Sequence, residues 1–283
     1  MRGGDHPDPL ITNEQDAERL ASDVVNAPGD DIDVGINAAA KLADDPRFVV
    51  PRILPEYSGR SVLTMTYEQG VALRSEQVRS LPQAQRAELG RSFIWLFLRE
   101  FFDWKMVQTD AHFGNYRVRL SEGQAPQLVL LDFGATRHFS SAFVAGYREV
   151  VAGAVERDQQ RLVAGAESIG LMSSGFPAET LKAFAELCYT IVEPFMIGTD
   201  HPPPAALVGD LGYRYGQTDL PRRVTQLMSR AALSRYFRIP PREIVFLHRR
   251  MAGAFIAQTV LDVEWDAREL VLDALGAAAD EAT

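Results

Sequence analysis

The sequence predicts an α+β fold with a few short strands in its first half and a mainly helical second half. Two pairs of runs rich in β-branched and apolar residues, each divided by polar or turn-forming residues, predict the strands. Beyond Arg137, apolar residues recur at three- and four-residue spacing almost to the end, which is typical of helices packed on a core. A small sheet beside a larger helical body is therefore expected.

Length, charge and cysteine content limit the class of protein. The 283 residues suffice for one large domain or two small ones with a sizeable core. A net charge of -9 argues against nucleic acid or an anionic membrane as the partner of the whole chain. The single cysteine, Cys188, cannot form an internal disulfide, which favours a reducing, cytoplasmic location.

Neither a secretion signal nor a membrane span is expected. The first 30 residues lack a basic start followed by an apolar run. The most apolar window, residues 93–102, is too short to cross a bilayer. Any contact with a membrane is therefore expected to be peripheral.

The chain is expected to divide into an irregular lead-in, a remnant of a strand-rich lobe with a hinge, and a helical lobe, over residues 1–45, 46–70 and 71–283. Several Gly and Pro residues interrupt the lead-in. Two strands are predicted over residues 48–54 and 61–67, with a turn-like break between them, and Gly70 ends the second.

The helical lobe is expected to be interrupted by a loop and a hairpin. Residues 83–104 carry an apolar stripe typical of a helix with one buried face. An irregular segment, residues 106–115, comes next, and then a hairpin of short strands over 116–120 and 128–131. Further helices are expected over residues 142–156, 158–169, 178–196, 220–236, 241–263 and 267–279, with an exposed loop at the three prolines 202–204.

This order of elements is that of the second half of a protein-kinase-like fold, and two acidic motifs stand where such a fold transfers phosphoryl groups. Asp110 and Asn115 have the spacing of a catalytic Asp and a metal-binding Asn. Asp132 ends an apolar run and precedes Phe133 and Gly134, which matches the carboxylate that holds magnesium. Either motif alone is also typical of an ordinary turn, but both together, in this order around a hairpin, favour a phosphate and metal site.

Several segments resemble the UbiB/AarF family of atypical kinase-like proteins, and within it the branch tied to coenzyme Q biosynthesis. They lie at residues 50–51, 61–65, 106–110, 114–115, 130–137, 239–241 and 247–253. The resemblance implies ATP and Mg²⁺ as cofactors, Asp110 as the catalytic base, and Asn115 and Asp132 as metal ligands. It also implies a hinge that meets adenine through its backbone, from Met65 to Glu68.

Other polar residues near these motifs have two interpretations each. His112 is expected either to touch a phosphate or the acceptor, or to cap its loop. Arg137 is expected to pair with Asp132 or a phosphate, or to form a surface salt bridge. His248, Arg249 and Arg250 are expected on a solvated or paired helix face.

Members of this family carry further elements N-terminal to these motifs that cannot be found here: a Lys-x-Gly-Gln signature, an alanine-rich nucleotide loop, a strand lysine and a helical glutamate. The chain has three lysines, Lys41, Lys105 and Lys182, and the residues after Lys41 suit a helix end better than a strand. A kinase-like C-lobe with a remnant of the N-lobe sheet is therefore expected, with weak nucleotide binding and little turnover. A truncation or a gene start placed too late would each account for the gap.

Three functions stay open at this point. The segment after Gly134 is short and lacks Ala-Pro-Glu, and Gln108 and Thr109 replace the usual His-Arg before Asp110, which argues against peptide phosphorylation. The leading hypothesis, which rests on the resemblance, is an ATP-dependent kinase-like protein or ATPase of quinone or isoprenoid-lipid metabolism, with a small or lipid-like acceptor. The alternatives are a small-molecule phosphotransferase of the aminoglycoside or choline-kinase type and a pseudokinase scaffold that binds protein partners.

Overall fold

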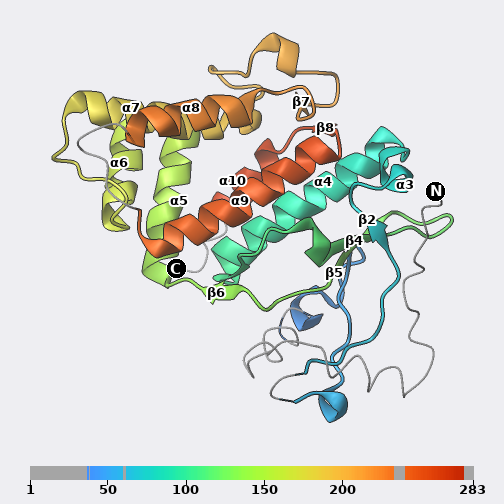
Figure 1. Ribbon diagram of the computed structural model, residues 1–283. Coiled ribbons are helices and arrows are strands. Elements are labelled where there is room, and N and C mark those ends of the chain that lie inside the picture. The colour runs from blue at the N-terminus through green and yellow to red at the C-terminus, as the bar shows by residue number, and fades with distance from the viewer. Residues whose placement is uncertain (1–36, 38, 60–61, 233–239, 277–283) are drawn as a thin grey trace, which may run out of the picture.

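The computed structural model describes residues 37, 39–59, 62–232 and 240–276. The first described residues and the largest sheet lie on one side of the molecule, and the helices fill the other side (Figure 1). Among the described residues, no helix is both long and apolar enough to cross a membrane.

The largest sheet has four strands in the order β1-β5-β4-β2, namely β1 (Phe48–Val49), β5 (Gln127–Leu130), β4 (Tyr116–Arg119) and β2 (Val71–Ala72). β1 runs parallel to β5, whereas β4 is antiparallel to both β5 and β2. β4 and β5 confirm the predicted hairpin. Two smaller sheets pair β3 (Met106–Gln108) with β6 (Thr136–His138), and β7 (Tyr213–Arg214) with β8 (Glu264–Trp265).

The strands predicted over residues 48–54 and 61–67 are wrong in length. Among the described residues of these two ranges, Phe48–Val49 alone forms a strand, and it pairs with β5. The two runs meet through an isolated bridge between Ile53 and Met65, beside a 2.9 Å hydrogen bond from the Leu54 N–H to the Thr64 carbonyl. Proline cannot donate to a strand ladder, and Pro55 opens a 3₁₀ turn, η1 (Pro55–Tyr57), in the middle of this region.

The predicted helices are confirmed, with differences at their ends. α4 (Gln83–Leu98) continues into a π-helical turn, η2 (Arg99–Asp103), and the short α3 (Glu76–Arg79) precedes it. The later helices are α5 (Ser141–Glu156), α6 (Gln159–Ser168), α7 (Ala178–Ile191), α8 (Leu220–Ala232), α9 (Arg242–Val260) and α10 (Arg268–Gly276). Residues 233–236 and 277–279 of the predicted helices lie outside the described residues. In the predicted exposed loop between α7 and α8, Pro203 is buried.

α4 and α9 lie side by side through the middle of the molecule (Figure 1). The Gln258 side chain of α9 donates to the Gly90 carbonyl of α4 over 2.9 Å and accepts the Trp265 Nε1–H over 3.0 Å. Gly90 permits this approach, since a Cβ there would lie 2.6 Å from the Gln258 Oε1 atom. α9 also packs against β3, the strand that leads into the segment with Asp110.

Candidate active site

Two strand pairs bring the two acidic motifs together. In one pair Gln108 of β3 lies opposite Thr136 of β6, and in the other Tyr116 of β4 lies opposite Leu130 of β5. The segment 106–115, predicted as irregular, thus begins with a strand and ends in a 3₁₀ turn, η3 (Phe113–Asn115). The Leu131 N–H donates to the Asn115 carbonyl over 3.0 Å, so Asn115 and Asp132 stand at neighbouring strand ends.

The Asp110 carboxylate is held from two sides. Asn115 Nδ2 donates to Asp110 Oδ2 over 3.2 Å and to the Asp110 carbonyl over 3.3 Å. Arg249 Nη2, from α9, donates to the other oxygen, Oδ1, over 2.6 Å. A carboxylate oriented in this way suits a group that accepts hydrogen bonds from a nucleophile's hydroxyl or from water.

Gln108 connects the two acidic motifs. Its buried side chain accepts a hydrogen bond from the Asp110 N–H and donates Nε2–H to the Asp132 carbonyl over 3.2 Å. The neighbouring Thr109 hydroxyl donates to the Ala135 carbonyl over 2.6 Å. The sequence identifies Gln108 and Thr109 only as replacements for the usual His-Arg. Their role depends on the turn after β5, more than 20 residues away, and local spacing carries no signal for it.

Asp132 and His112 are both exposed, and each caps a backbone amide. Asp132 Oδ1 accepts the Gly134 N–H over 2.8 Å, which folds the Asp-Phe-Gly segment into an Asx-type turn. His112 Nδ1 accepts the Gly114 N–H over 3.0 Å at the start of η3. This contact agrees with the loop-capping interpretation of His112.

The expected hinge residues lie apart from this cluster. Glu68 forms an ion pair with Arg119 at the far end of β4 from Asn115, and it accepts the Thr66 hydroxyl over 2.9 Å. Met65 is half-buried and faces Ile53 in the isolated bridge. The structure therefore gathers Asp110, Asn115 and Asp132, whereas Glu68 pairs with the opposite end of β4 and Met65 pairs with Ile53 outside the named strands.

A buried ion pair between α9 and η2 lies close to the site. Arg250 Nε donates to Glu100 Oε2 over 3.0 Å, with side-chain exposures of 1% and 8%. Burial raises the pKa of Glu100, and the neighbouring Arg250 guanidinium opposes that shift. The Arg250 guanidinium also lies 5.8 Å from the ring centroid of Tyr116, the residue that follows Asn115. The sequence indicated a paired or solvated face here, and the structure shows a paired one.

Residues 35–166 match the ABC1 atypical kinase-like domain. This part of the chain is an ABC1 atypical kinase-like domain. The chain is 34% identical over 232 residues to the mitochondrial atypical kinase COQ8B of Rattus norvegicus, which covers 82% of this chain and 40% of the relative. It is 28% identical over 221 residues to the mitochondrial atypical kinase COQ8 of Saccharomyces cerevisiae, covering 77% and 40%. The resemblance to this family is thus confirmed.

One solved structure of another protein has a fold similar to that of this chain. A complex of Rv3197 with erythromycin from Mycobacterium tuberculosis matches with a TM-score of 0.59 over 91% of this chain and 59% of that one. At 19% identity, this similarity shows the kinase-like fold alone. The chain spans two fifths of the length of the two curated relatives.

The donor atoms of this ABC1 site suit a magnesium ion that a nucleotide brings with it. No group of three or more His, Cys, Asp and Glu side chains in the described residues could hold a metal ion. Mg²⁺, however, usually takes one or two carboxylates and fills its other positions with phosphates and water. The exposed Asp132 carboxylate and the amide oxygen of Asn115, whose Nδ2 faces Asp110, fit that pattern.

Two of the three lysines, and Arg137, contact residues outside the two acidic motifs. Lys41 lies in a helical stretch, as expected, with Nζ 5.3 Å from the Trp104 ring centroid. Lys105 Nζ donates to the Ser141 hydroxyl over 3.1 Å, and Lys182 is exposed on α7. Arg137 stacks on Phe246 of α9 at 3.8 Å, and among the described residues it forms neither an ion pair with Asp132 nor another salt bridge. Its contact with a phosphate stays a prediction.

Proposed function

We propose that this chain is the nucleotide-dependent part of an atypical kinase or ATPase that supports ubiquinone or related isoprenoid-lipid synthesis. The observation that carries the proposal is the convergence of Asp110, Asn115 and Asp132 at two adjoining strand ends. The atypical-kinase names of the relatives, including COQ8 and COQ8B, support the assignment to ubiquinone metabolism.

Each residue of the cluster has a role in this proposal. Asp110, fixed by Asn115 and Arg249, orients the hydroxyl or water that attacks the terminal phosphate. Asn115 and Asp132 hold Mg²⁺, which neutralises the charge on the phosphates when bound. His112 lies on the exposed rim of the loop, where it would meet a phosphate or the acceptor. The backbone from Met65 to Glu68 would receive the adenine.

Weak affinity for ATP is part of the proposal. The side chains of Lys41 and Lys105 are engaged elsewhere, and Lys182 lies on α7. A charge-assisted contact from a lysine to the phosphates contributes about 1.5–3 kcal/mol, which corresponds to about 10- to 150-fold in affinity. Nucleotide binding by this chain is therefore expected to be weaker than that of a site with such a lysine.

The acceptor is proposed to be small or lipid-like rather than a peptide. After Gly134 the chain enters β6, which is paired with β3, and α5 begins at Ser141. The few residues between them leave little chain for the platform on which protein kinases lay their peptide substrates.

The test compares Mg²⁺-dependent ATP binding by calorimetry in the wild-type chain and in Asp132→Asn. The substitution keeps the size of the side chain but removes its charge, so a loss of about tenfold or more in affinity is expected. Asp210→Asn, in the exposed loop before β7, is the matched control and should bind like wild type. Equal affinity in Asp132→Asn and wild type would contradict the metal role, and no binding by wild type would favour a scaffold.

Hydrolysis of ATP separates binding from chemistry. Asp110→Asn is expected to leave nucleotide affinity within a few fold and to lower turnover by about 10²-fold or more, the usual range for a group that handles a proton. Turnover unchanged in Asp110→Asn would remove that residue from the chemistry while leaving the binding test in force.

A further inference from the structure

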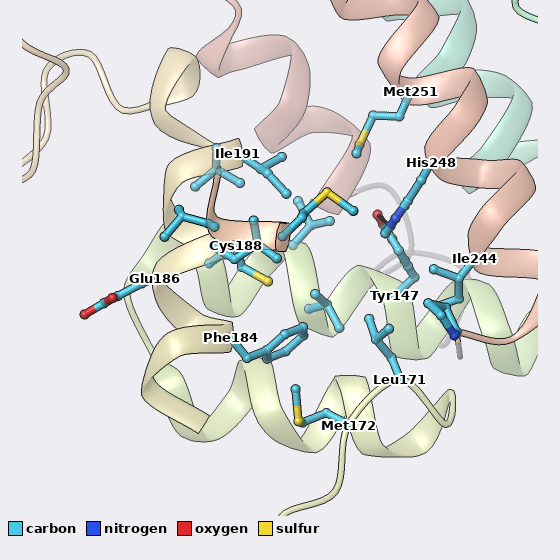
Figure 2. A pocket seen from close by; sticks show the side chains of 18 of the residues that line it. Tyr147, Leu171, Met172, Phe184, Glu186, Cys188, Ile191, Ile244, His248 and Met251 are labelled. Carbon is cyan, nitrogen blue, oxygen red and sulfur yellow. Dashed lines mark hydrogen bonds between the residues drawn. The ribbon is translucent and has the colours of Figure 1, made fainter. Parts of the chain in front are cut away.

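A cavity of about 540 Å³ lies in the helical part of the chain, among α5, α7, α8 and α9. Interiors of well-packed domains contain few voids larger than a water molecule, and small-molecule sites usually occupy about 300–1,000 Å³. The lining is mainly aliphatic and aromatic, and Figure 2 shows Leu171, Met172, Phe184, Ile191 and Met251 around it. Asp110, Asn115 and Asp132 do not line this cavity.

Tyr147 and His248 form a hydrogen-bonded polar pair in the lining of this cavity, which also includes Thr180. The Tyr147 hydroxyl of α5 and the His248 Nε2 of α9 lie 3.0 Å apart in a hydrogen bond, and both residues line the cavity (Figure 2). Burial lowers the pKa of His248 to about 4 and raises the pKa of the Tyr147 hydroxyl above its usual value. Both groups are therefore uncharged near pH 7, while each still offers a hydrogen-bonding atom.

The charged residues of the lining belong to its rim. Glu179, Glu186 and Arg230 are exposed, and Figure 2 shows Glu186 directed away from the cavity. Cys188 lines the interior, where burial raises the pKa of its thiol to about 12, so it too is uncharged. An occupant with a charged group would have to bury it against apolar walls without a counter-charge, which costs several kcal/mol.

We propose that this cavity binds a neutral, mainly apolar small molecule of the lipid class that carries one hydroxyl or carbonyl group. The apolar part fills the space between α7 and α9, and the polar group contacts the Tyr147–His248 pair. This site is separate from the proposed nucleotide site, and its test needs no nucleotide.

The probe is 1-decanol, and Cys188 reports occupancy because it is the single cysteine of the chain. The rate at which N-ethylmaleimide alkylates Cys188, followed by intact mass spectrometry, is expected to fall at least fivefold as 1-decanol saturates the cavity. The thermal unfolding midpoint should rise in the same titration, since a ligand that binds only the folded state stabilises it. n-Decylammonium, which has the same chain with a charged head, is expected to bind at least tenfold more weakly.

Two variants test the site itself. Tyr147→Phe removes one hydrogen-bonding atom and should weaken 1-decanol about threefold to tenfold, the size of one net hydrogen bond. Tyr189→Phe on α7, whose ring stacks with Arg157 rather than facing the cavity, is the matched control and should bind as wild type does. Leu187→Trp should fill the space and thereby abolish the protection of Cys188 by 1-decanol. If Leu187→Trp does not fold, Ala183→Leu serves as the second space-filling variant.

The proposal is overturned if 1-decanol neither slows alkylation nor raises the midpoint in wild type. It is also overturned if n-decylammonium binds as tightly as 1-decanol, because the alcohol would then gain nothing from the uncharged pair. Equal losses in Tyr147→Phe and Tyr189→Phe would contradict the contact between the polar group and Tyr147.

Discussion

Two adjacent arginines of α9 stand in opposite environments. Arg249 is 60% exposed and pairs with Asp110, whereas Arg250 is 1% exposed and pairs with Glu100. Exposed ion pairs contribute about 0–1 kcal/mol because water screens them and long side chains lose entropy. Removal of one partner from a buried pair leaves an uncompensated charge and costs about 3–5 kcal/mol.

We therefore expect Arg250→Met to lower the free energy of unfolding by about 3–5 kcal/mol. Arg249→Met, the neighbouring control, should lower it by less than about 1 kcal/mol and act mainly on turnover. Urea denaturation of both variants measures the difference. Similar losses for the two would mean that the Glu100 pair contributes no more than a surface contact.

His248 gives the stability of the chain a defined dependence on pH. Its pKa is about 4 in the folded chain, against an ordinary value of 6.5, because burial disfavours the charged ring. The groups that face it are uncharged: the Tyr147 hydroxyl from α5 and, across the cavity, the Cys188 thiol from α7. Between these two pH values the unfolded chain takes up a proton that the folded chain does not.

The free energy of unfolding is therefore expected to fall as pH drops from about 6.5 to about 4, by up to about 3 kcal/mol from this residue. His248→Gln should be less stable at pH 7, since it loses a fitted ring, but its stability should fall less over the same interval. Denaturant titrations at several pH values compare the two slopes. Parallel pH profiles would show that another group titrates.

At the scale of elements, α9 is the part of the molecule that meets both candidate sites. His248 faces the cavity, Arg249 holds Asp110, and Gly253 packs directly on the loop that carries Asp110. A Cβ at Gly253 would lie 2.3 Å from the Ala111 Cβ, next to Asp110, and 3.4 Å from the Ala111 Cα. Neither partner is the end of a flexible side chain, so helix and loop would have to move apart.

Gly253→Ala is accordingly expected to lower the free energy of unfolding by about 1–3 kcal/mol and to reduce ATP turnover. The higher helix propensity of alanine, about 1 kcal/mol, offsets only part of the strain. Gly276→Ala is the control, because it also changes a helical glycine, and no other described residue beyond its own helix turn has an atom within 4 Å of the added Cβ. If Gly253→Ala were as stable and active as Gly276→Ala, close packing of α9 on the loop would not constrain the site.

The elements that the sequence predicts well are those whose pattern is local. The position of α4 and the hairpin of β4 and β5 follow from the spacing of neighbouring residues. The single buried face predicted for α4 is wrong, because nearly every side chain from Ser92 to Leu98 is buried. The runs around Ile53 and Met65 have strand composition, but prolines leave a single bridge between them. β3 was missed because its partner, β6, lies some 30 residues further along the chain.

At the scale of the whole molecule, the candidate site also has a part that the sequence predicts and a part that it does not. Asp110, Asn115 and Asp132 could be predicted because they stand at fixed spacing in short motifs. The contacts that hold them could not, since Arg249 reaches Asp110 across 139 residues and Arg250 reaches Glu100 across 150. Such pairs depend on how α9 packs on α4 and β3, and that packing is a property of the complete fold.

α10 joins parts of the chain that are far apart in sequence, so it reports on the molecule as a whole. It packs against α4, α5, η2 and the 3₁₀ turn η4 (Glu193–Phe195). Arg268, at its first turn, donates to the Phe195 carbonyl over 3.0 Å, and Arg148 of α5 donates to the Leu275 carbonyl near its end over 3.1 Å. Val271 is 3% exposed between these contacts, whereas the adjacent Leu272 is 40% exposed.

If the last helix is part of one cooperative fold, Val271→Ala should lower the free energy of unfolding by about 2 kcal/mol, from lost burial and the small cavity left behind. Leu272→Ala removes a larger side chain and should cost less than about 0.5 kcal/mol, because that side chain is already partly in water. The dependence on urea concentration should stay the same in both variants, since the surface exposed on unfolding does not change. A lower urea dependence in Val271→Ala would instead show that α10 detaches before the rest of the molecule unfolds.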